Sequence, residues 1–265
     1  MIDKRTESKV DMVLKELRGR GRVAVALSGG VDSSTLTALA FKALGENAIA
    51  VTIKSPLTIP EEAAMARKVA KLIGVKHIVI PFNELEIPGF DENPPERCYL
   101  CKKRRSQLLK KEVGGYVIAD GTTADDLKDY RPGIRALKEE GVWSPLLEAK
   151  LTKKEVRMIA EELGLPNSDA PPNSCLATRF PHGEKLTPQK LSKVAEAERV
   201  VRETLSVRLV RVRVHGQLAR IEVGEDELEK ALNKQKLREA AVKIRKLGYR
   251  FATLDLEGYK PGKHV

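Results

Sequence analysis

Residues 23–34 read VAVALSGGVDSS, an apolar run that leads directly into a turn of serines and glycines. The run predicts a buried β-strand at 22–27, and the pattern after the turn predicts a helix at 33–44. Glycine lets the backbone approach an anion closely, and such a turn directs several N–H groups and two hydroxyls at it. The helix adds the positive end of its dipole. The stretch therefore predicts a phosphate-binding loop between a strand and a helix.

The segment Ser28–Ser34 resembles the PP-loop of ATP pyrophosphatases, which cleave ATP between its α and β phosphates. It differs from a Walker A loop because no Gly-Lys-Ser/Thr sequence follows. An ordinary glycine-rich turn is the alternative, but seven matched positions between a strand and a helix favour the ATP site. Asp32 is expected to act in catalysis by helping to hold Mg²⁺ on the pyrophosphate. The residues expected to bind ATP are Ser28, Gly29, Gly30, Asp32, Ser33 and Ser34.

The first half of the chain alternates short apolar runs with helical patterns. Strands are expected at 22–27, 48–53, 76–81 and 116–120, and helices at 33–44, 61–73 and 153–163. Alternating strands and helices predict an α/β fold in which a parallel sheet is covered on both faces. Ligands of such a sheet bind at the carboxyl ends of its strands, where the loop Ser28–Ser34 lies.

The pattern changes after a long loop rich in Pro and Asn at 165–185. A loop of this length is usually functional or a linker, and we interpret it as a hinge that carries catalytic residues. Beyond it, we expect a helix at 187–205, strands at 208–215 and 218–223, a long helix at 225–247 and a strand at 249–254. The expected domains are a PP-loop ATP pyrophosphatase domain at 1–170, a catalytic loop at 171–186 and a smaller α+β domain at 187–265.

The composition is that of a globular protein, with 265 residues, 42% of them hydrophobic, and a net charge of +11. No apolar stretch approaches the ~20 residues that span a bilayer. The charged N-terminal segment reads as an amphipathic helix rather than a signal peptide, so we expect a cytoplasmic protein. The positive charge would attract nucleotides or tRNA, or only reflect a Lys/Glu-rich surface. Aromatic residues make up 4% of the chain, which disfavours a base-stacking nucleic-acid site.

The chain has three cysteines, Cys98, Cys101 and Cys175, and this odd number argues against a disulfide framework. The first two have the CxxC spacing of metal ligands and redox pairs, and a basic run follows at 102–105. Four interpretations remain open: a zinc site that recruits His182 or His77, a redox pair, unconnected structural thiols, or a [4Fe–4S] cluster. A cluster bound by three cysteines leaves one iron open to a ligand such as hydrosulfide. Together with an ATP pyrophosphatase loop, this interpretation is favoured.

Two further groups of polar residues accompany predicted strands. After the strand at 116–120, Gly121 permits close backbone approach, and Asp126 would bind Mg²⁺ or a ribose, or only cap a helix. In the strand at 208–215, period-2 alternation places Arg211 and Arg213 on one face. Two arginines so spaced form a fork suited to a phosphate or to carboxylates, unless the face is merely solvated.

Several segments together resemble the LarE family, ATP-dependent sulfur transferases that help build the nickel-pincer nucleotide cofactor of lactate racemase. These segments are SGGVDSS, ERCYLCK, ADGTTADDLKDYRPGIRAL, SPLLEAKLTKKEVR and CLATRFPHGE, in this order. The similarity extends from about residue 22 to the C-terminus and is strongest over 22–185. The RPG and CLATRFPHG segments are far more specific to this family than the PP-loop, which NAD synthase, GMP synthase and tRNA thiolases share.

The resemblance implies that ATP adenylates a carboxylate of pyridinium-3,5-biscarboxylic acid mononucleotide and that sulfur then displaces AMP, leaving a thiocarboxylate. Cys175 matches the position that gives up its own sulfur in single-cysteine members. Its accompaniment by Cys98 and Cys101 resembles members thought to use a [4Fe–4S] cluster, with all three cysteines as ligands. The cofactor-binding residues then include Gly121, Thr123 and Asp126, and the substrate-binding residues are Arg179, Glu198, Arg211 and Arg213.

The partners implied are a small nucleotide-like carboxylate, sulfide or another sulfur donor, and further copies of the chain in a homo-oligomer. The cofactors implied are ATP, Mg²⁺ and the [4Fe–4S] cluster. A tRNA thiolase of the PP-loop class and an amide ligase similar to NAD synthase are the alternative functions.

Overall fold

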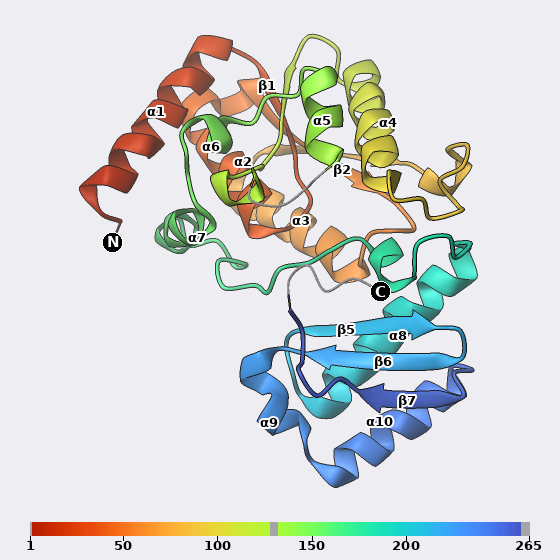
Figure 1. The fold of residues 1–265 in the computed structure, drawn as a ribbon. Coiled ribbons are helices and arrows are strands. Elements are labelled where there is room, and N and C mark those ends of the chain that lie inside the picture. The colour runs from red at the N-terminus through yellow and green to blue at the C-terminus, as the bar shows by residue number, and fades with distance from the viewer. Residues whose placement is uncertain (1, 128–131, 261–265) are drawn as a thin grey trace. The chain divides into compact units, whose positions relative to one another are not determined.

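A computed structural model describes residues 2–127 and 132–260, and the chain divides into two compact units (Figure 1). The first unit comprises Met1–Asn83 and Glu96–Pro172, and the second comprises Glu84–Pro95 and Asn173–Val265. The segment Glu84–Pro95 leaves the first unit between a strand and a helix and packs with the second. Each unit contains its own sheet, as described below.

The first unit contains a four-stranded parallel sheet, which confirms the predicted α/β fold. Its strands are β1 (Val23–Ala26), β2 (Ala48–Lys54), β3 (Lys76–Pro81) and β4 (Val117–Ala119), in the order β3-β2-β1-β4. Val23 pairs with Ala48 on one side and with Val117 on the other. This order places β1 next to β4, at the point where the strand order reverses and where ligands of open parallel sheets bind.

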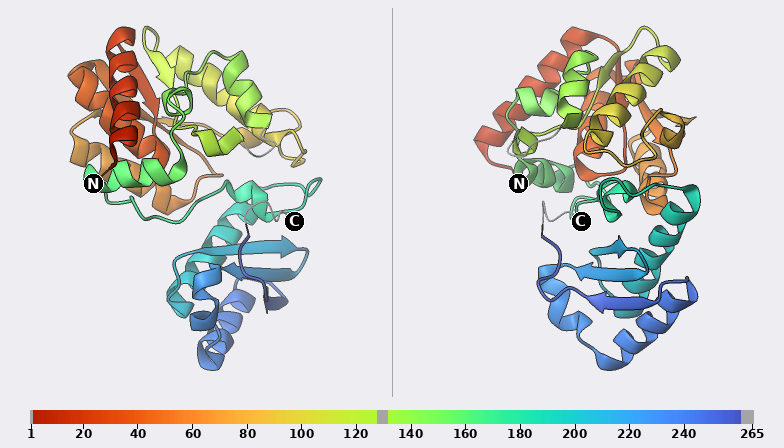
Figure 2. Two further views of the ribbon diagram at one scale, coloured as in Figure 1. Left: turned by 60° about the vertical axis from the view of Figure 1, so that its left-hand side comes forward. Right: turned by 45° about the vertical axis from the view of Figure 1, so that its right-hand side comes forward.

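Helices cover both faces of this sheet (Figure 2). They are α1 (Lys4–Arg20), α2 (Val31–Leu44), α3 (Pro60–Ile73), α4 (Arg97–Glu112), α5 (Pro132–Glu139), α6 (Pro145–Glu148) and α7 (Lys153–Glu162). Val23 and Val25 share a core with buried residues of α1, α2 and α7, whereas Ala24 shares a different core with Leu109 of α4 and with Val113, which follows that helix. Successive residues of β1 therefore pack on opposite faces, as expected for a buried strand.

The second unit contains the strands β5 (Val210–His215), β6 (Leu218–Val223) and β7 (Phe251–Leu254) in the order β5-β6-β7. β5 and β6 are antiparallel, and β7 runs parallel to β6. The helix α8 (Pro188–Leu205) packs on β5 and on α10 (Lys234–Lys246), which packs on β7. The predicted α+β arrangement of helix, hairpin, helix and strand is present.

The predicted continuous helix at 225–247 is wrong. The structure has a 3-10 turn at Glu225–Glu227, a short helix α9 (Leu228–Ala231) and then α10. Asn233 has an extended backbone, and its side chain accepts a hydrogen bond from the Lys236 amide, so it caps a new helix. The helices α4 and α5 were not among the expected elements. Among the described residues, no helix combines the length and apolarity that crossing a membrane requires.

Candidate active site

The predicted phosphate loop lies at the carboxyl end of β1, and α2 begins directly after it at Val31. Gly29 has φ = +91°, and a Cβ atom there would lie 2.2 Å from the Glu62 carbonyl oxygen of α3. Only glycine fits this position, because a side chain would meet both an unfavourable backbone conformation and a main-chain atom. Gly30 occupies the N-cap position of α2 with an extended backbone, so the amides of the first helical turn begin at the loop.

Serine hydroxyls close the loop internally. The Ser33 Oγ donates to the Gly30 carbonyl at 3.1 Å and accepts from the Ser28 amide at 3.1 Å. The Ser28 Oγ lies 3.0 Å from the Ser33 Oγ and accepts from the Gly30 amide at 3.3 Å. Ser33 and Ser34 are buried, whereas Ser28 is exposed. The Ser33 hydroxyl thus shapes the loop, and Ser28 presents its hydroxyl on the solvent side.

The segment after β4 packs directly against the first turn of α2. A Cβ at Gly121 would lie 2.7 Å from the Ser33 nitrogen and 2.9 Å from the Asp32 carbonyl carbon. Further along, the Asp126 Oδ2 accepts from both the amide and the hydroxyl of Thr123 at 2.9 Å. Its Oδ1 lies 3.0 Å from Lys153 Nζ. Gly121 therefore permits close approach of two backbone segments, and Asp126 fixes the turn that follows.

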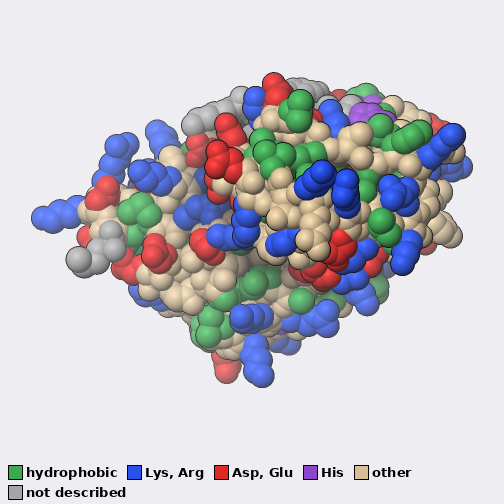
Figure 3. Space-filling model, turned by 90° about the horizontal axis from the view of Figure 1, so that it is seen from below, with side chains coloured by type: hydrophobic (Ala, Val, Ile, Leu, Met, Phe, Trp, Pro, Cys, Tyr) green, Lys and Arg blue, Asp and Glu red, His purple; other side chains and the backbone are tan. Residues whose placement is uncertain are grey.

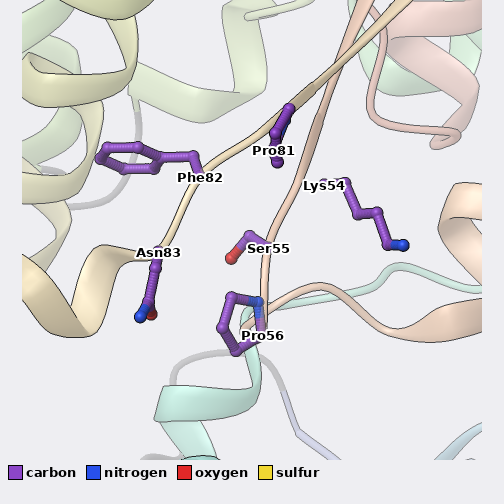
Figure 4. A pocket seen from close by; sticks show the side chains of 6 residues that line it. All are labelled: Lys54, Ser55, Pro56, Pro81, Phe82 and Asn83. Atoms are coloured by element: carbon purple, nitrogen blue, oxygen red, sulfur yellow. The ribbon is translucent and has the colours of Figure 1, made fainter.

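An open hollow lies at the same edge of the sheet, where β2 and β3 end. Figure 4 shows that Lys54, Ser55 and Pro56 line it from the end of β2, while the end of β3 contributes Pro81, Phe82 and Asn83. The side chains of Lys54 and Phe82 point to opposite sides of these two segments. In parallel sheets the carboxyl edge is where ligands bind, so the hollow and the loop occupy the ligand-binding edge.

Cys98 and Cys101 lie in the first two turns of α4, and Cys175 lies in the second unit. The three are thiols rather than disulfides, and Cys98 and Cys175 are exposed. Arg135 of α5 lies over the ring of Tyr99 at 4.4 Å, so α5 packs beside the CxxC turn. Within the parts of the chain that the structure describes, no group of three or more His, Cys, Asp or Glu side chains is placed to hold a metal ion.

Cys175 immediately precedes a 3-10 turn, Leu176–Arg179, that ends in a fully buried arginine. The Cys175 carbonyl accepts from the amide and the hydroxyl of Thr178, at 3.0 and 2.8 Å. Arg179 donates from Nε to the Glu198 Oε1 at 2.7 Å and from Nη2 to the Glu198 Oε2 at 3.2 Å. Its Nη1 donates to the Ser174 hydroxyl at 2.7 Å. Nη1 also donates to the Thr178 hydroxyl at 2.8 Å, so residues on both sides of Cys175 are fixed to one guanidinium.

Arg211 and Arg213 are each 2% exposed, so the alternative of a solvated strand face is wrong. Arg213 donates from Nε to Glu222 Oε2 at 3.1 Å and from Nη1 to the Thr178 carbonyl at 2.8 Å. Burial lowers the pKa of Arg211 to about 10, with a further lowering from the nearby Arg179 charge. Burial also lowers the pKa of Arg213, and Glu222 opposes that effect. Burial is thus the main cause of both shifts, and the neighbouring Arg179 charge adds to each of them.

The sequence reasoning missed Glu222, which is completely buried and pairs across the strands with Arg211. A charged residue within the otherwise apolar end of the strand at 218–223 was the available signal. Three buried guanidiniums, those of Arg179, Arg211 and Arg213, face the two carboxylates of Glu198 and Glu222. The cluster thus has the charge and the donors to bind an anion.

The chain is similar in sequence to several known proteins. An asparagine synthase family model matches residues 8–92, the part that contains the phosphate loop. An uncharacterized protein of Synechocystis is 41% identical over 97% of each chain. The pyridinium-3,5-bisthiocarboxylic acid mononucleotide synthase of Lactiplantibacillus plantarum is 35% identical over 94% of this chain and 90% of its own. The chain belongs to the LarE family. It is an ATP-dependent sulfurtransferase of the adenylating PP-loop type, as LarE proteins are.

A glutamine-hydrolyzing GMP synthase component of Archaeoglobus fulgidus is 30% identical over 76% of this chain and 71% of its own length. The LarE similarity is higher and covers more of both chains.

The surface shows how the positive charge of the chain is distributed. On the face shown in Figure 3, Lys and Arg side chains are interspersed with Asp and Glu side chains. Such mixing is typical of a charged protein surface rather than of a single basic patch.

Proposed function

We propose that this LarE protein adenylates a carboxylate of pyridinium-3,5-biscarboxylic acid mononucleotide and converts it to a thiocarboxylate. The observation that carries the proposal is the 35% identity with the synthase of Lactiplantibacillus plantarum over nearly the whole of both chains. The phosphate loop, the cysteines and the buried arginines supply groups that such a reaction needs.

In the first half-reaction, a carboxylate oxygen of the substrate attacks the α-phosphorus of ATP, and the bond to the β-phosphate oxygen breaks. Pyrophosphate leaves, and the substrate carries an acyl-adenylate. Amides of the loop Ser28–Gly30 and of the first turn of α2 would bind the pyrophosphate as its charge develops. We assign Asp32 to the Mg²⁺ on this leaving group, and Gly121, Thr123 and Asp126 to the nucleotide.

In the second half-reaction, a sulfur nucleophile attacks the acyl carbon, and AMP leaves with the former carboxylate oxygen. We assign Cys175 to this step as a ligand of the cluster described below rather than as the source of the sulfur; its thiol is exposed and its flanking residues are fixed by Arg179. Arg211 and Arg213 are assigned to the substrate phosphate. Glu198 supports this role through Arg179 and through the Val212 amide, which donates to its Oε1 at 3.0 Å.

A [4Fe–4S] cluster with Cys98, Cys101 and Cys175 as ligands is part of the proposal. The donor set fits, since all three are thiols, and two stand three residues apart in the first two turns of a 16-residue helix. When bound, such a cluster would supply an iron with an open position for the sulfur to be transferred.

The test is a reaction of anaerobically purified protein with the biscarboxylic acid mononucleotide, MgATP and sulfide. We expect AMP, pyrophosphate and a thiocarboxylate product by mass spectrometry, and about four irons per chain. Stoichiometric zinc without iron would overturn the cluster. Amide formation with ammonia in place of sulfide would instead indicate a ligase, and salt-sensitive binding and thiolation of tRNA would indicate a tRNA thiolase.

The family resemblance also supports a homo-oligomer, for which light scattering of the purified chain is the measurement. A mass equal to that of one chain at micromolar concentration would overturn that part of the proposal.

A further inference from the structure

A side chain from far along the sequence holds the carbonyl of Gly29. Asn167 lies in the turn that follows α7, and 1% of it is exposed. Its Nδ2 donates to the Gly29 carbonyl oxygen at 2.8 Å and to the Ser34 Oγ at 2.9 Å. A carbonyl oxygen can only accept, so the amide must present its NH₂ group here. Both hydrogens of that group are thereby used at the two ends of the phosphate loop.

The bond to Gly29 decides which way the next peptide faces. In a planar trans peptide, the Gly29 carbonyl and the Gly30 N–H point in opposite directions. With the carbonyl turned toward buried Asn167, the Gly30 N–H turns toward exposed Ser28, to whose Oγ it donates. Two successive glycines leave this peptide free to rotate, and a rotated peptide would direct a carbonyl oxygen at the phosphates. That arrangement repels the anion that the loop must bind.

The backbone around Asn167 is itself anchored. Arg157 of α7 donates from Nη1 to the Ser168 carbonyl at 2.9 Å and from Nη2 to the Ala170 carbonyl at 2.7 Å. The Ala170 amide donates to the Asn167 carbonyl at 3.1 Å. This guanidinium fork fixes the turn from which the Asn167 side chain reaches the loop.

The other end of the side chain indicates that Asn167 does more than stabilise the fold. Its Oδ1 is buried and has no hydrogen-bond partner in the described part of the chain. An unsatisfied buried oxygen lowers stability, and an apolar side chain of similar size would avoid that cost. The NH₂ group, rather than the amide as a whole, is what this position requires.

We infer that Asn167 is a positioning residue of the ATP site, which fixes the Gly29–Gly30 peptide so that amides face the pyrophosphate portion of ATP. The inference rests on the proposed function, because it assumes that the loop binds pyrophosphate. Asn167 itself touches no reacting atom. It acts through the orientation of one peptide and through the first turn of α2.

The test uses Asn167→Leu in the full chain, which removes the donors without adding a charge. Titration calorimetry measures the affinities for MgATP, magnesium pyrophosphate and AMP. We expect at least about a tenfold loss for the first two, the effect of one hydrogen bond to a charged group, and no more than a threefold change for AMP. A purely structural role would weaken all three ligands alike.

Thr37→Val is the matched control. Thr37 is a buried residue of α2 whose hydroxyl donates to the Ser33 carbonyl at 2.7 Å, and its loss leaves the Gly29 carbonyl untouched. Its pyrophosphate affinity should stay within twofold of the original chain. If Asn167→Leu does not fold, Asn167→Ser, which keeps one donor, takes its place. Its affinities for MgATP and magnesium pyrophosphate should fall by a smaller factor, and its affinity for AMP should stay unchanged.

Unchanged pyrophosphate affinity in a folded Asn167 variant, or an equal loss of AMP affinity, would overturn the inference. Failure of the original chain to bind ATP and pyrophosphate would overturn the proposed function instead.

Discussion

Replacing Glu198 by glutamine tests how strongly the buried arginines of the second unit depend on their carboxylates. Glu198 is 1% exposed, and three hydrogen bonds converge on it, two from Arg179 at 2.7 and 3.2 Å and one from the Val212 amide at 3.0 Å. Glutamine has nearly the same shape but keeps one acceptor oxygen and carries no charge. If that oxygen keeps the two shorter bonds, the new NH₂ group faces a guanidinium N–H, and two donors oppose each other.

The size of the effect follows from burial. Both partners are essentially inaccessible to water, with side chains 0% and 1% exposed, so solvent cannot replace the lost charge. Removing one partner of a buried ion pair costs about 3–5 kcal/mol, because the other charge stays buried without compensation. At about 2–4 °C per kcal/mol for a chain of this size, the melting temperature should fall by roughly 6–20 °C.

The assay is a calorimetric melt of the full chain at neutral pH, without substrate, beside a control on the same helix. Glu203→Gln removes a carboxylate that pairs with Arg199 at 2.7 Å, but its side chain is 61% exposed. Exposed pairs contribute about 0–1 kcal/mol, so this control should melt within about 4 °C of the original chain. If Glu198→Gln melts no lower than Glu203→Gln, the reasoning from burial is wrong.

Three further changes test other parts of the molecule. Gly121→Ala places a Cβ 2.7 Å from the Ser33 nitrogen. The free energy of unfolding in urea should therefore fall by about 1–3 kcal/mol, and ATP binding should weaken. An unchanged free energy of unfolding would contradict the close packing of Gly121 on α2. Burial and the Arg67 charge lower the pKa of His77, so the unfolded chain takes up a proton more readily than the folded one below about pH 6.5. Stability should therefore fall from pH 7 to pH 5, and less steeply in His77→Gln; equal slopes in thermal melts contradict this. Cys175→Ala should retain ATP–pyrophosphate exchange but form no thiocarboxylate, whereas continued product formation would remove Cys175 from the sulfur-transfer step.

The elements whose pattern is local could be predicted from the sequence. The apolar run before Ser28 ends at two glycines, and this fixed both the strand β1 and the start of α2 to within two residues. The helix expected at 153–163 begins at Lys153, where Thr152 forms a capping box with Glu155. In both cases the deciding contacts lie within a few residues of each other, so periodicity and capping rules suffice.

The partners of the buried polar groups could not be predicted, because they depend on contacts between distant segments. Asn167 is 138 residues from Gly29, and nothing in its local sequence separates it from an ordinary turn residue. Glu222 meets Arg213 only because the register of β5 and β6 brings them together.

The break in the helix expected at 225–247 was missed for a different reason. By helix propensity alone, a single Asn does not end a helix. Its side chain accepts a hydrogen bond from the Lys236 amide, and this capping role is visible only in the folded chain.

The arginine strand shows why alternation by itself left two interpretations open. A solvated face and a buried polar face have the same period, and only tertiary packing separates them. Packing leaves Arg211 and Arg213 2% exposed, and burial lowers the pKa of both. A buried charge attracts an anion more strongly than an exposed one, because the dielectric constant is lower in the interior. The three guanidiniums exceed the two carboxylates by one positive charge, which a bound phosphate would balance. This charge argument, beside the family similarity, is why we assign recognition of a phosphate-bearing acceptor to the second unit, and activation of its carboxylate to the first.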